Sequence, residues 1–328
     1  MRSVGQGVRK KDSAALLSGK PVYTEDVSPK NCLQVVILRS PHAHAMIEEI
    51  DVSRALKAPG VACALTYHDV LDIRFTQAGQ TYPEFSPYDR LILDRHLRCV
   101  GDPVAIVAAA TREQAEAAIR LIRVKYQILP AILDAKTAKD NPVCIHPEEN
   151  WRALVPCGAD NRRNLVAEGR DESGDIEAEL AACDIIIEQD YSTLANQQAM
   201  METFRASTHL DAYGRLTVIS STQVPFHVRR NVATALGIPK NQVRVIKPRI
   251  GGGFGAKQTM VCEVYPAIVT MKTGLPAMIV YTRGESQTIS SPRHAMNIHV
   301  RLGATKDGVI RAVDMFTLSN SGAYGEHG

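Results

Sequence analysis

Four of the five residues from Gly251 to Gly255 are glycine, and this run constrains the fold more than any other feature of the chain. A glycine in an ordered segment loses much backbone entropy and adds no packing surface, so a run of them needs a compensating benefit. The benefit is close approach of backbone N–H groups to a neighbour. A strand is predicted before the run, from Gln242, and an apolar helix after it, at about 261–272. A glycine loop at a helix N-terminus favours anions, so the pattern predicts an anion or oxo-group site.

The glycine run can also be interpreted as one of two nucleotide-binding motifs. Gly251-x-Gly253-x-x-Ala256 matches the dinucleotide pattern G-x-G-x-x-G/A, but an antiparallel hairpin follows where further βα units belong. A NAD(P)-binding dehydrogenase is therefore a distant alternative. A P-loop is excluded, because Ala256 stands where glycine is needed and Gln258 stands where a hydroxyl should bind magnesium. A tight turn under a neighbouring element is the interpretation without a ligand.

Length and charge narrow the class of protein. A chain of 328 residues is expected to form about two domains. Its net charge is only +3 and its basic and acidic residues are interspersed, so no nucleic-acid partner is expected. No stretch approaches the ~20 apolar residues of a membrane span, and the N-terminus has no uninterrupted apolar segment of a secretory signal. We therefore expect a cytoplasmic protein.

The metal-ligating residue types are scattered along the chain. Its seven cysteines include no CxxC pair, which argues against a zinc or iron–sulfur site and for reduced thiols. His227, His294 and His299 lack metal-ligand spacing and are interpreted as structural or surface groups. Glu263, Glu285 and Glu326 are available carboxylates, which we expect to be exposed surface acids. Any metal chemistry must therefore arrive on a cofactor.

The front of the chain alternates strand and helix patterns. A helix is expected to begin after Thr111, because Gln114 completes a capping-box pattern and apolar residues recur at helical spacing as far as Ile122. Extended segments are expected at 32–40, 42–51 and 61–66, with a strand after Val100 and a short helix near 53–57. Together they predict an α+β unit of about 100 residues. Residues 135–175 are rich in turn-forming pairs and are interpreted as a connector.

The back of the chain carries a second set of elements. Residues 175–194 are predicted to form a helix and then a strand, and residues 206–220 a hairpin around Tyr213-Gly214. A helix ending at Gly237 comes before the glycine run, and a strand at 277–281 comes after it. The tail is predicted to be two alternating strands joined at Asp307-Gly308.

Several motifs in order resemble one family. GGGFGAK, preceded by the STQ of Ser221–Gln223, resembles the xanthine dehydrogenase/aldehyde oxidase family of molybdenum hydroxylases, specifically the front part of the molybdopterin-binding (large) subunit. LRSPHAHAMIEEID and VGDPVAIVAAATREQAEAA look like its hammerhead domain, and the opening with Lys11-Asp12 is also similar. The resemblance covers nearly the whole chain. It implies an α+β fold with an N-terminal extension and α/β hammerhead domain at 1–135, a linker at 136–175 and a first molybdopterin-binding domain at 176–328 that is truncated on its C-terminal side.

The resemblance also assigns a site. Gln223 matches the glutamine whose amide donates toward an oxygen on the molybdenum, a role suited to a neutral donor. Phe254 and Gly255 match a catalytic pair beside the metal, where the ring can stack on a flat substrate. Gly252, Gly253 and Ala256 would bind the cofactor with Gln223, Phe254 and Gly255, and no residue would ligate the metal directly, because the pterin holds it. Gln258 would contact substrate where purine enzymes of the family have glutamate. Gln198 replaces their histidine, and Glu202 is expected to support the site.

The implied function is hydroxylation of xanthine or a related N-heterocycle with water as the oxygen source. The cofactor would be molybdenum-molybdopterin in the cytosine dinucleotide form, with iron–sulfur clusters and FAD on partner subunits. A C-terminal chain or continuation would supply the rest of the site, including the base. Aldehydes or nicotinate-like acids are alternative substrates, and an inactive truncated fragment or assembly module is an alternative without catalysis. Either incomplete form should expose an apolar face on the strands after Ala295.

Overall fold

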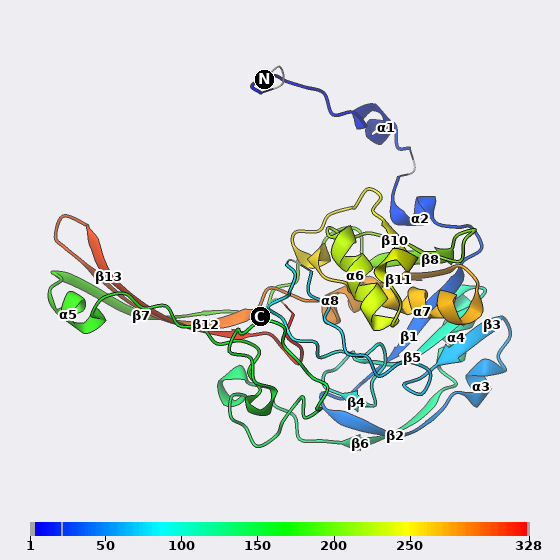
Figure 1. The fold of residues 1–328 in the computed structure, drawn as a ribbon, viewed down its shortest axis with the longest axis horizontal. Helices are drawn as coiled ribbons and strands as arrows, with labels where there is room; N and C mark the ends of the chain where they lie inside the picture. Colours follow the sequence, from blue (N-terminus) through cyan, green and yellow to red (C-terminus); the bar gives the residue numbers. More distant parts are fainter. Residues whose placement is uncertain (1–3, 21, 80, 327–328) are drawn as a thin grey trace.

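The computed structural model describes residues 4–20, 22–79 and 81–326, and strands from both halves of this described chain join in one sheet (Figure 1). This α+β architecture confirms the predicted fold class. The described strands of the large sheet follow the order β10-β9-β8-β11-β1-β5-β3. They are β1 (Leu33–Arg39), β3 (Val61–Leu65), β5 (Pro103–Ala109), β8 (Arg205–Leu210), β9 (Leu216–Ser220), β10 (Val243–Ile246) and β11 (Ala277–Val280). Because β1 runs parallel to β11, a hydrogen-bonded strand pair joins the two halves.

The large sheet is buried on both faces, and strand alternation assigns each residue to a face. On β5, Ile106 and Ala108 belong to the larger core, whereas Val107 and Ala109 belong to a smaller cluster with Ala115. Alternate residues of a strand point to opposite faces, so the two clusters lie on opposite sides of the sheet. The larger core is closed by α6 (Pro225–Ala235) and α7 (Val264–Thr273), and the smaller one by α3 (Ser53–Leu56) and α4 (Arg112–Ile119).

The helix predicted after Thr111 is present but shorter than expected. Thr111 caps α4 and forms the predicted capping box with Gln114. The helix ends at Ile119, and the strand β6 (Arg123–Ile128) follows where the helical pattern continued to Ile122. Alternating Val124, Tyr126 and Ile128 fit the strand better than the helix. β6 pairs with β2 (Ala45–Asp51), which also pairs with β4 (His96–Leu97).

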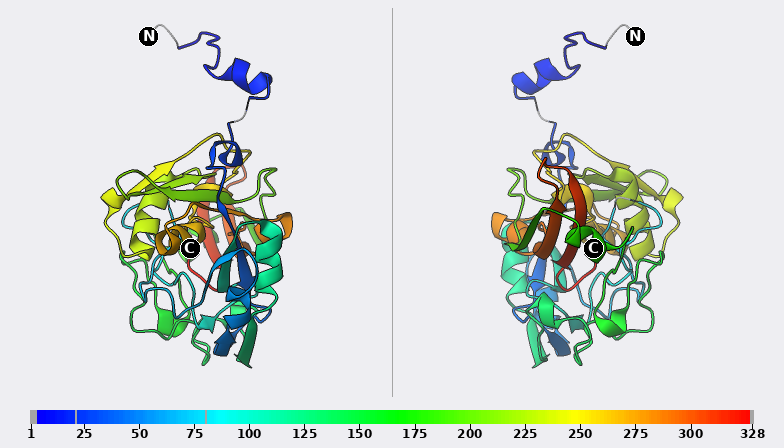
Figure 2. Two further views of the ribbon diagram at one scale, coloured as in Figure 1. Left: turned by 90° about the vertical axis from the view of Figure 1, so that its right-hand side faces the viewer. Right: turned by 90° about the vertical axis from the view of Figure 1, so that its left-hand side faces the viewer.

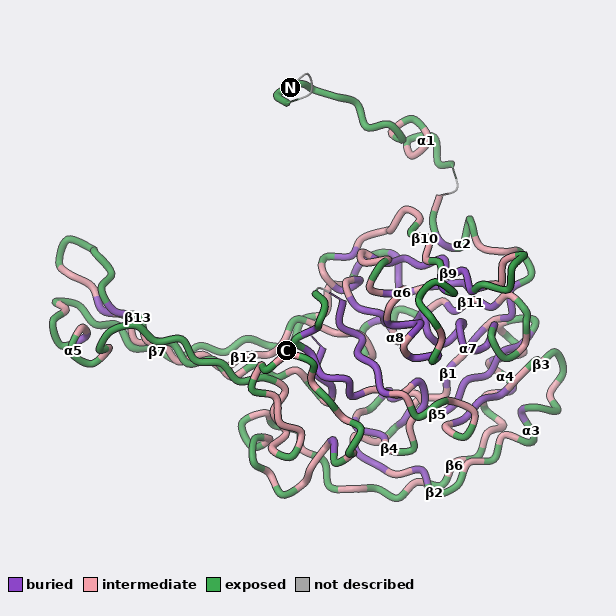
Figure 3. Tube along the Cα trace, in the orientation of Figure 1, coloured by how far each residue is buried: buried purple, intermediate pink, exposed green. Residues whose placement is uncertain are grey.

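A narrow antiparallel sheet projects from the main body; we call it the β-arm (Figures 1 and 3). It consists of β7 (Ile185–Thr193), β12 (Ala295–Ala304) and β13 (Ile310–Asn320). The helix α5 (Ile176–Ala181) covers one face near the tip, where a Cβ on Gly303 would meet Cys183 Sγ at 2.6 Å. On the other face Ile187, Leu302 and Val313 lie opposite one another, and Ile187 and Val313 are 55% and 56% exposed. The strands after Ala295 therefore carry the expected exposed apolar face.

The remaining segments are short. At the N-terminal side α1 (Ser13–Leu17) lies away from the body (Figures 1 and 2), whereas α2 (Thr24–Val27) is anchored by a 2.6 Å hydrogen bond between Ser28 and Ser207. The helix α8 (Arg283–Thr288) was not predicted. The connector contains the 3-10 turns η1 (Ala135–Thr137) and η2 (Asn161–Arg163), and another such turn, η3 (Lys240–Gln242), precedes β10.

The connector lies against the rest of the protein. The Tyr88 N–H, for example, donates to the Arg152 carbonyl at 2.8 Å. The domain boundaries at 135 and 175 stay a prediction. Among the described residues, every helix is too short or too polar to cross a membrane.

Candidate functional site

The glycine loop, Gly251–Gly255, lies between β10 and the 3-10 turn η4 (Ala256–Gln258). The α-helix α7 begins only at Val264, so the prediction of a loop at a helix N-terminus was wrong. The segment 259–263 separates the two, and a helix dipole acts only within its first turn. The dinucleotide alternative also fails, because β11 pairs with β8 and β1 and does not pair with β10, so no βαβ unit surrounds the loop.

The middle of the loop presents backbone donors. Gly251 N–H donates to Glu202 Oε2 at 2.7 Å, and Ala256 N–H donates to the Gly253 carbonyl at 2.9 Å. Between them, the four N–H groups from Gly252 to Gly255 make no hydrogen bond to any residue that the structure describes. Backbone N–H groups are strong donors that seek a partner, and successive ones in such turns form anion-binding concavities. The loop therefore offers the donors that its glycines predicted.

Phe254, one of these four residues, has an unusual backbone conformation. Its φ is +50°, a left-handed value that a residue with a bulky side chain adopts at a cost of about 1–3 kcal/mol. Its side chain is 75% exposed and so gains little from burial. Backbone strain of this kind clusters at ligand sites, where the surroundings hold it in place. The ring stands open to a partner.

Gln223 approaches the loop from the end of β9. Its N–H donates to the Lys257 carbonyl at 2.8 Å, which places its side chain beside Gly253. A Cβ on Gly253 would lie 2.5 Å from Gln223 Oε1, so glycine at 253 permits this approach. Gln223 Oε1 is buried and has no hydrogen-bond partner among the described residues. The structure thus brings Gln223 and the loop together, while their roles stay a prediction.

A second segment, 197–202, also lies against the loop, where the Glu202 N–H donates to the Gly251 carbonyl at 3.1 Å. A Cβ on Gly252 would lie 3.1 Å from the Cβ of Met200, so this glycine is also needed for close approach. Arg283, in α8, donates to the carbonyls of Met200 at 2.7 Å and Met201 at 2.8 Å. No local sequence signal indicated this clamp, because Arg283 is far from the segment along the chain.

The other predicted site residues differ in whether a ligand could reach them. Ala256 is 2% exposed and packs in the larger core, and its N–H is used inside the loop. The Gln258 carboxamide lies close to Gly255, since a Cβ on Gly255 would be 4.0 Å from Gln258 Oε1. Gly255 itself has a φ of +92°, and apart from its chain neighbours no other described atom lies within 4 Å of the position where its Cβ would be. Gln258 can therefore contact a ligand at Gly255, whereas Ala256 supports the loop from behind.

Two carboxylates expected on the surface are buried. Glu263 is 3% exposed, accepts hydrogen bonds from Ser220 Oγ at 2.7 Å and the Cys262 N–H at 2.9 Å, and has a pKa raised by burial. Glu326 is 6% exposed and pairs with Arg90 at 2.5 Å. The expectation was wrong for both, because each carboxylate has a partner far along the chain, Ser220 for Glu263 and Arg90 for Glu326. Glu285 is half-buried and accepts from Arg39 at 3.3 Å.

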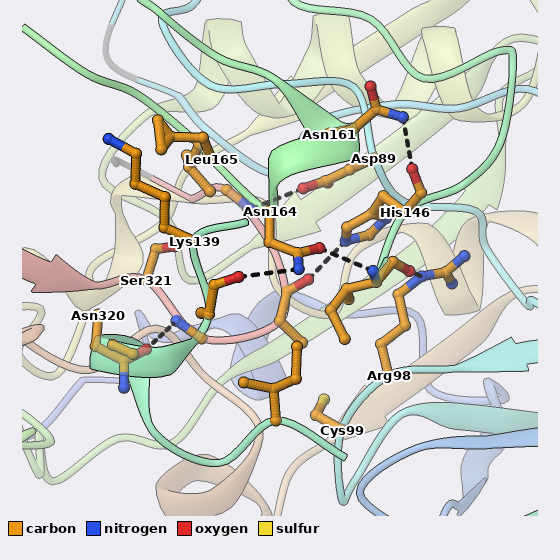
Figure 4. Close-up of a pocket in the computed structure, with 18 of the residues that line it drawn as sticks. Asp89, Arg98, Cys99, Lys139, His146, Asn161, Asn164, Leu165, Asn320 and Ser321 are labelled. Atoms are coloured by element: carbon orange, nitrogen blue, oxygen red, sulfur yellow. Dashed lines mark hydrogen bonds between the residues drawn. The ribbon is translucent and has the colours of Figure 1, made fainter. Parts of the chain in front are cut away.

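A cavity of about 520 Å³ lies between the connector and residues 317–325 (Figure 4). None of the residues predicted for the site lines it. Its two basic side chains are paired: Lys139 with Glu168 at 2.5 Å, and Arg98 with Asp94 at 2.8 Å. Asn164 donates to the Ala138 and Val143 carbonyls and so holds the wall together. The glycine loop remains the candidate site.

Comparison with known proteins identifies the family. The model of the molybdopterin cofactor-binding domain matches residues 159–328, more than half of the chain. The model of the aldehyde oxidase and xanthine dehydrogenase a/b hammerhead domain matches residues 18–130. The chain belongs to the xanthine dehydrogenase and aldehyde oxidase family. The two matches follow one another in the order that the sequence motifs predicted.

Individual relatives in this family are similar over almost the whole chain. The probable hypoxanthine oxidase of Escherichia coli K12 is 38% identical over 99% of this chain, which spans 36% of that protein's length. The nicotinate dehydrogenase large molybdopterin subunit of Eubacterium barkeri is 32% identical, and this chain spans 72% of it. The structure of the aldehyde oxidoreductase from Desulfovibrio gigas superposes with a TM-score of 0.79, at 25% identity over 94% of this chain and 34% of that one.

The glycine loop fits a molybdopterin of the kind that this family binds. Four consecutive unpaired N–H groups, counted within the described part of the chain, match the many oxygen and nitrogen acceptors of such a group. The absence of Cβ atoms at Gly252 and Gly253 lets Met200 and Gln223 pack directly against the loop that would hold it. The carboxamide oxygen of Gln223 is buried and lacks a partner among the residues that the structure describes, so a cofactor could satisfy it.

Proposed function

We propose that this chain forms one wall of a molybdenum hydroxylase centre that oxidises xanthine or a related N-heterocycle with water as the oxygen source. The convergence of the Gln223 carboxamide and the unpaired N–H groups of Gly252–Gly255 carries the proposal. Both are neutral hydrogen-bonding groups, and they follow β9 and β10, which are neighbouring strands of the large sheet. Preorganised groups of this type stabilise charge that develops on oxygen without competing as metal ligands.

Each residue would have a distinct task. Molybdenum-molybdopterin, when bound, supplies the two-electron oxidation of the substrate carbon. The N–H groups of Gly252–Gly255 would hold the cofactor, and the Gln223 amide would donate to one of its oxygens. The exposed ring of Phe254 would stack on a flat substrate, where aromatic pairs gain about 0.5–1.5 kcal/mol beyond their buried area. Gln258, beside Gly255, would bind a substrate edge as a neutral donor or acceptor.

The substrate class follows from the site and from the relatives. Two relatives, a probable hypoxanthine oxidase and a nicotinate dehydrogenase subunit, are named after N-heterocyclic compounds. A flat, electron-poor ring is also the shape that the open Phe254 ring can bind. The neutral Gln258 argues against strict xanthine specificity, since purine enzymes of the family have a charged residue there. Aldehydes are the second substrate class, which the structural similarity to an aldehyde oxidoreductase favours.

Further components complete the proposal. Glu202, the carboxylate in contact with the loop, is held by Gly251 and Lys257, so the catalytic base is assigned to a C-terminal chain or continuation. The cofactor is assigned as the cytosine dinucleotide form. Iron–sulfur and FAD subunits would carry the electrons away. A cytoplasmic location is proposed with them, because all seven cysteines are free thiols.

The test is oxygen-isotope labelling of the product. The purified protein, with the polypeptides that co-purify with it, is incubated in H2-18O with a dye as electron acceptor and with hypoxanthine, xanthine, nicotinate or benzaldehyde. The proposal expects an 18O atom in the hydroxylated heterocycle by mass spectrometry. Turnover of benzaldehyde alone would favour the second substrate class. Oxygen derived from O2, or product formation independent of molybdenum, would refute the proposal.

A further inference from the structure

We infer that Lys257 is a positioning residue, a buried cation that holds the glycine loop and Gln223 in register with each other. The inference rests on the proposed function, since it assigns the support of the same site. Lys257 follows the loop directly, in η4, and its side chain is 0% exposed. A lysine is almost never fully buried unless it is paired, so its burial here needs a specific reason.

The side chain of Lys257 supports one end of the loop. Its Nζ donates to Glu202 Oε2 at 2.9 Å and to Ser221 Oγ at 2.7 Å. The same Glu202 oxygen accepts the Ser221 hydroxyl at 2.5 Å and the Gly251 N–H at 2.7 Å. One carboxylate oxygen therefore links the ammonium group, the end of β9 and the first residue of the loop.

The backbone of Lys257 supports the other half of the site. Its carbonyl accepts the Gln223 N–H at 2.8 Å and the Thr222 hydroxyl at 3.3 Å. A single residue thus fixes Gly251 through its side chain and Gln223 through its main chain. If Gly251 and Gln223 moved relative to each other, the contact between the Gln223 side chain and Gly253 would change. This contact is close, because a Cβ on Gly253 would lie 2.5 Å from Gln223 Oε1.

The Lys257–Glu202 pair has no net charge. Burial lowers the pKa of the Lys257 ammonium group, and the hydrogen bond to Glu202 opposes that shift. Burial alone would raise the pKa of Glu202, but the Gly251 N–H, Ser221 and Lys257 outweigh it and lower the pKa. The hydrogen bond between the two groups favours the charged form of each partner. The hydrogen bonds of the pair to Ser221 and Gly251 assign it a role in holding geometry.

The other groups near the Lys257–Glu202 pair are either uncharged or have an ion-pair partner of their own. Arg205 Nε lies 3.9 Å from Glu202 Oε1, and Arg205 is itself paired with Glu25. Cys262 lies near Lys257, and burial keeps its pKa well above the usual thiol value. Removal of the ammonium group would thus leave Arg205, at 3.9 Å, as the only cationic partner of Glu202 among the described residues. An unpaired buried carboxylate is strongly unfavourable, so Glu202 would move and release Gly251.

The test compares four variants of the purified holoprotein. Lys257→Met keeps the chain length and removes the charge, Glu202→Gln removes the other charge, and the double variant removes both while it keeps an acceptor for the Gly251 N–H. Lys306→Met is the matched control, since Lys306 is 85% exposed in the β-arm hairpin. Hydrogen exchange is measured by mass spectrometry on peptides that cover the loop, with molybdenum and pterin content and the unfolding midpoint alongside.

Lys257→Met is expected to exchange at Gly251 at least about tenfold faster than the wild type and to lose most of its pterin. The double variant is expected to recover both values to within about twofold, because no buried charge is left unpaired. Lys306→Met should match the wild type. If Lys257→Met does not fold, Glu202→Gln against the double variant gives the same comparison.

Wild-type exchange and pterin content in Lys257→Met would overturn the inference, as would a double variant no better than either single one. A wild-type protein that lacks molybdenum and pterin would refute the proposed function instead. In that case the exchange rates still decide whether the pair positions the loop, so the two failures are distinguishable.

Discussion

Substitution of Gly253 by alanine would place a methyl group against the carboxamide of Gln223. The new Cβ would lie 2.5 Å from Gln223 Oε1 and 2.8 Å from its Cδ, far inside van der Waals contact. The backbone itself allows alanine, since Gly253 does not have a positive φ. The atoms that must move belong to a flexible side chain and not to the main chain. Gly253→Ala should therefore displace Gln223 and leave the fold intact.

The two consequences differ in size. Turning Gln223 into a less favourable rotamer costs about 0.5–1.5 kcal/mol, so the unfolding midpoint should fall only slightly. A displacement of about 1 Å at a reacting centre costs about 10²-fold in rate. That factor corresponds to about 2.7 kcal/mol of activation free energy. We therefore expect a variant that folds almost normally and turns over about one hundred times more slowly.

The assay is steady-state kinetics and thermal unfolding of Gly253→Ala, Gln223→Ala and the double variant. Because both single changes remove the same contact, their effects on kcat should not add. Gly214→Ala is the control: its φ is +74° and no atom lies within 4 Å of the new Cβ, so it should lose about 1–2 kcal/mol of stability and keep kcat. Full activity in Gly253→Ala, or additive losses in the double variant, would refute the reasoning.

Two further predictions concern stability. Burial raises the pKa of Asp89 from 3.8 to about 6. The folded protein then keeps this proton up to about pH 6, whereas the unfolded chain releases it near pH 3.8, so the stabilisation is fully present below pH 3.8 and is lost as pH rises through 6. Between pH 4 and 7 this group should lower the free energy of unfolding by about 3 kcal/mol, and Asp89→Asn should remove that loss. Urea unfolding measured across this pH range tests the prediction. An unchanged pH dependence in Asp89→Asn would contradict it. Thr111→Ala removes the capping box of α4 and should cost about 1 kcal/mol by thermal unfolding, and a loss below a few tenths would argue against the cap.

Local signals in the sequence predicted most elements well. The capping box of Thr111 and Gln114 marked the start of α4, and Asp307-Gly308 marked the turn between β12 and β13. These features depend on neighbouring residues only, so a single sequence contains the information. The end of α4 was misplaced, because Ile122 continues the helical pattern although it lies outside the helix.

Long-range features were beyond the same reasoning. The parallel pairing of β1 with β11 joins Leu33 to Ala277, and no local pattern indicates which strands meet. The burial of Glu263 and the Lys257–Glu202 pair depend likewise on partners from distant segments. The glycine loop was predicted as a site, but its place before a 3-10 turn and not before α7 became visible only in three dimensions.

The central claim is that the loop Gly252–Gly255 holds molybdopterin, and cofactor content tests it most directly. Molybdenum and oxidised pterin are measured in the wild type and in Gly252→Val, with Gly214→Val as the control. At Gly252 the φ is +96° and a Cβ would lie 3.1 Å from the Cβ of Met200, so valine should push the loop out of its position. The account predicts stoichiometric molybdenum and pterin in the wild type and the control, and loss of both in Gly252→Val. Retention of the full cofactor content in Gly252→Val would contradict it.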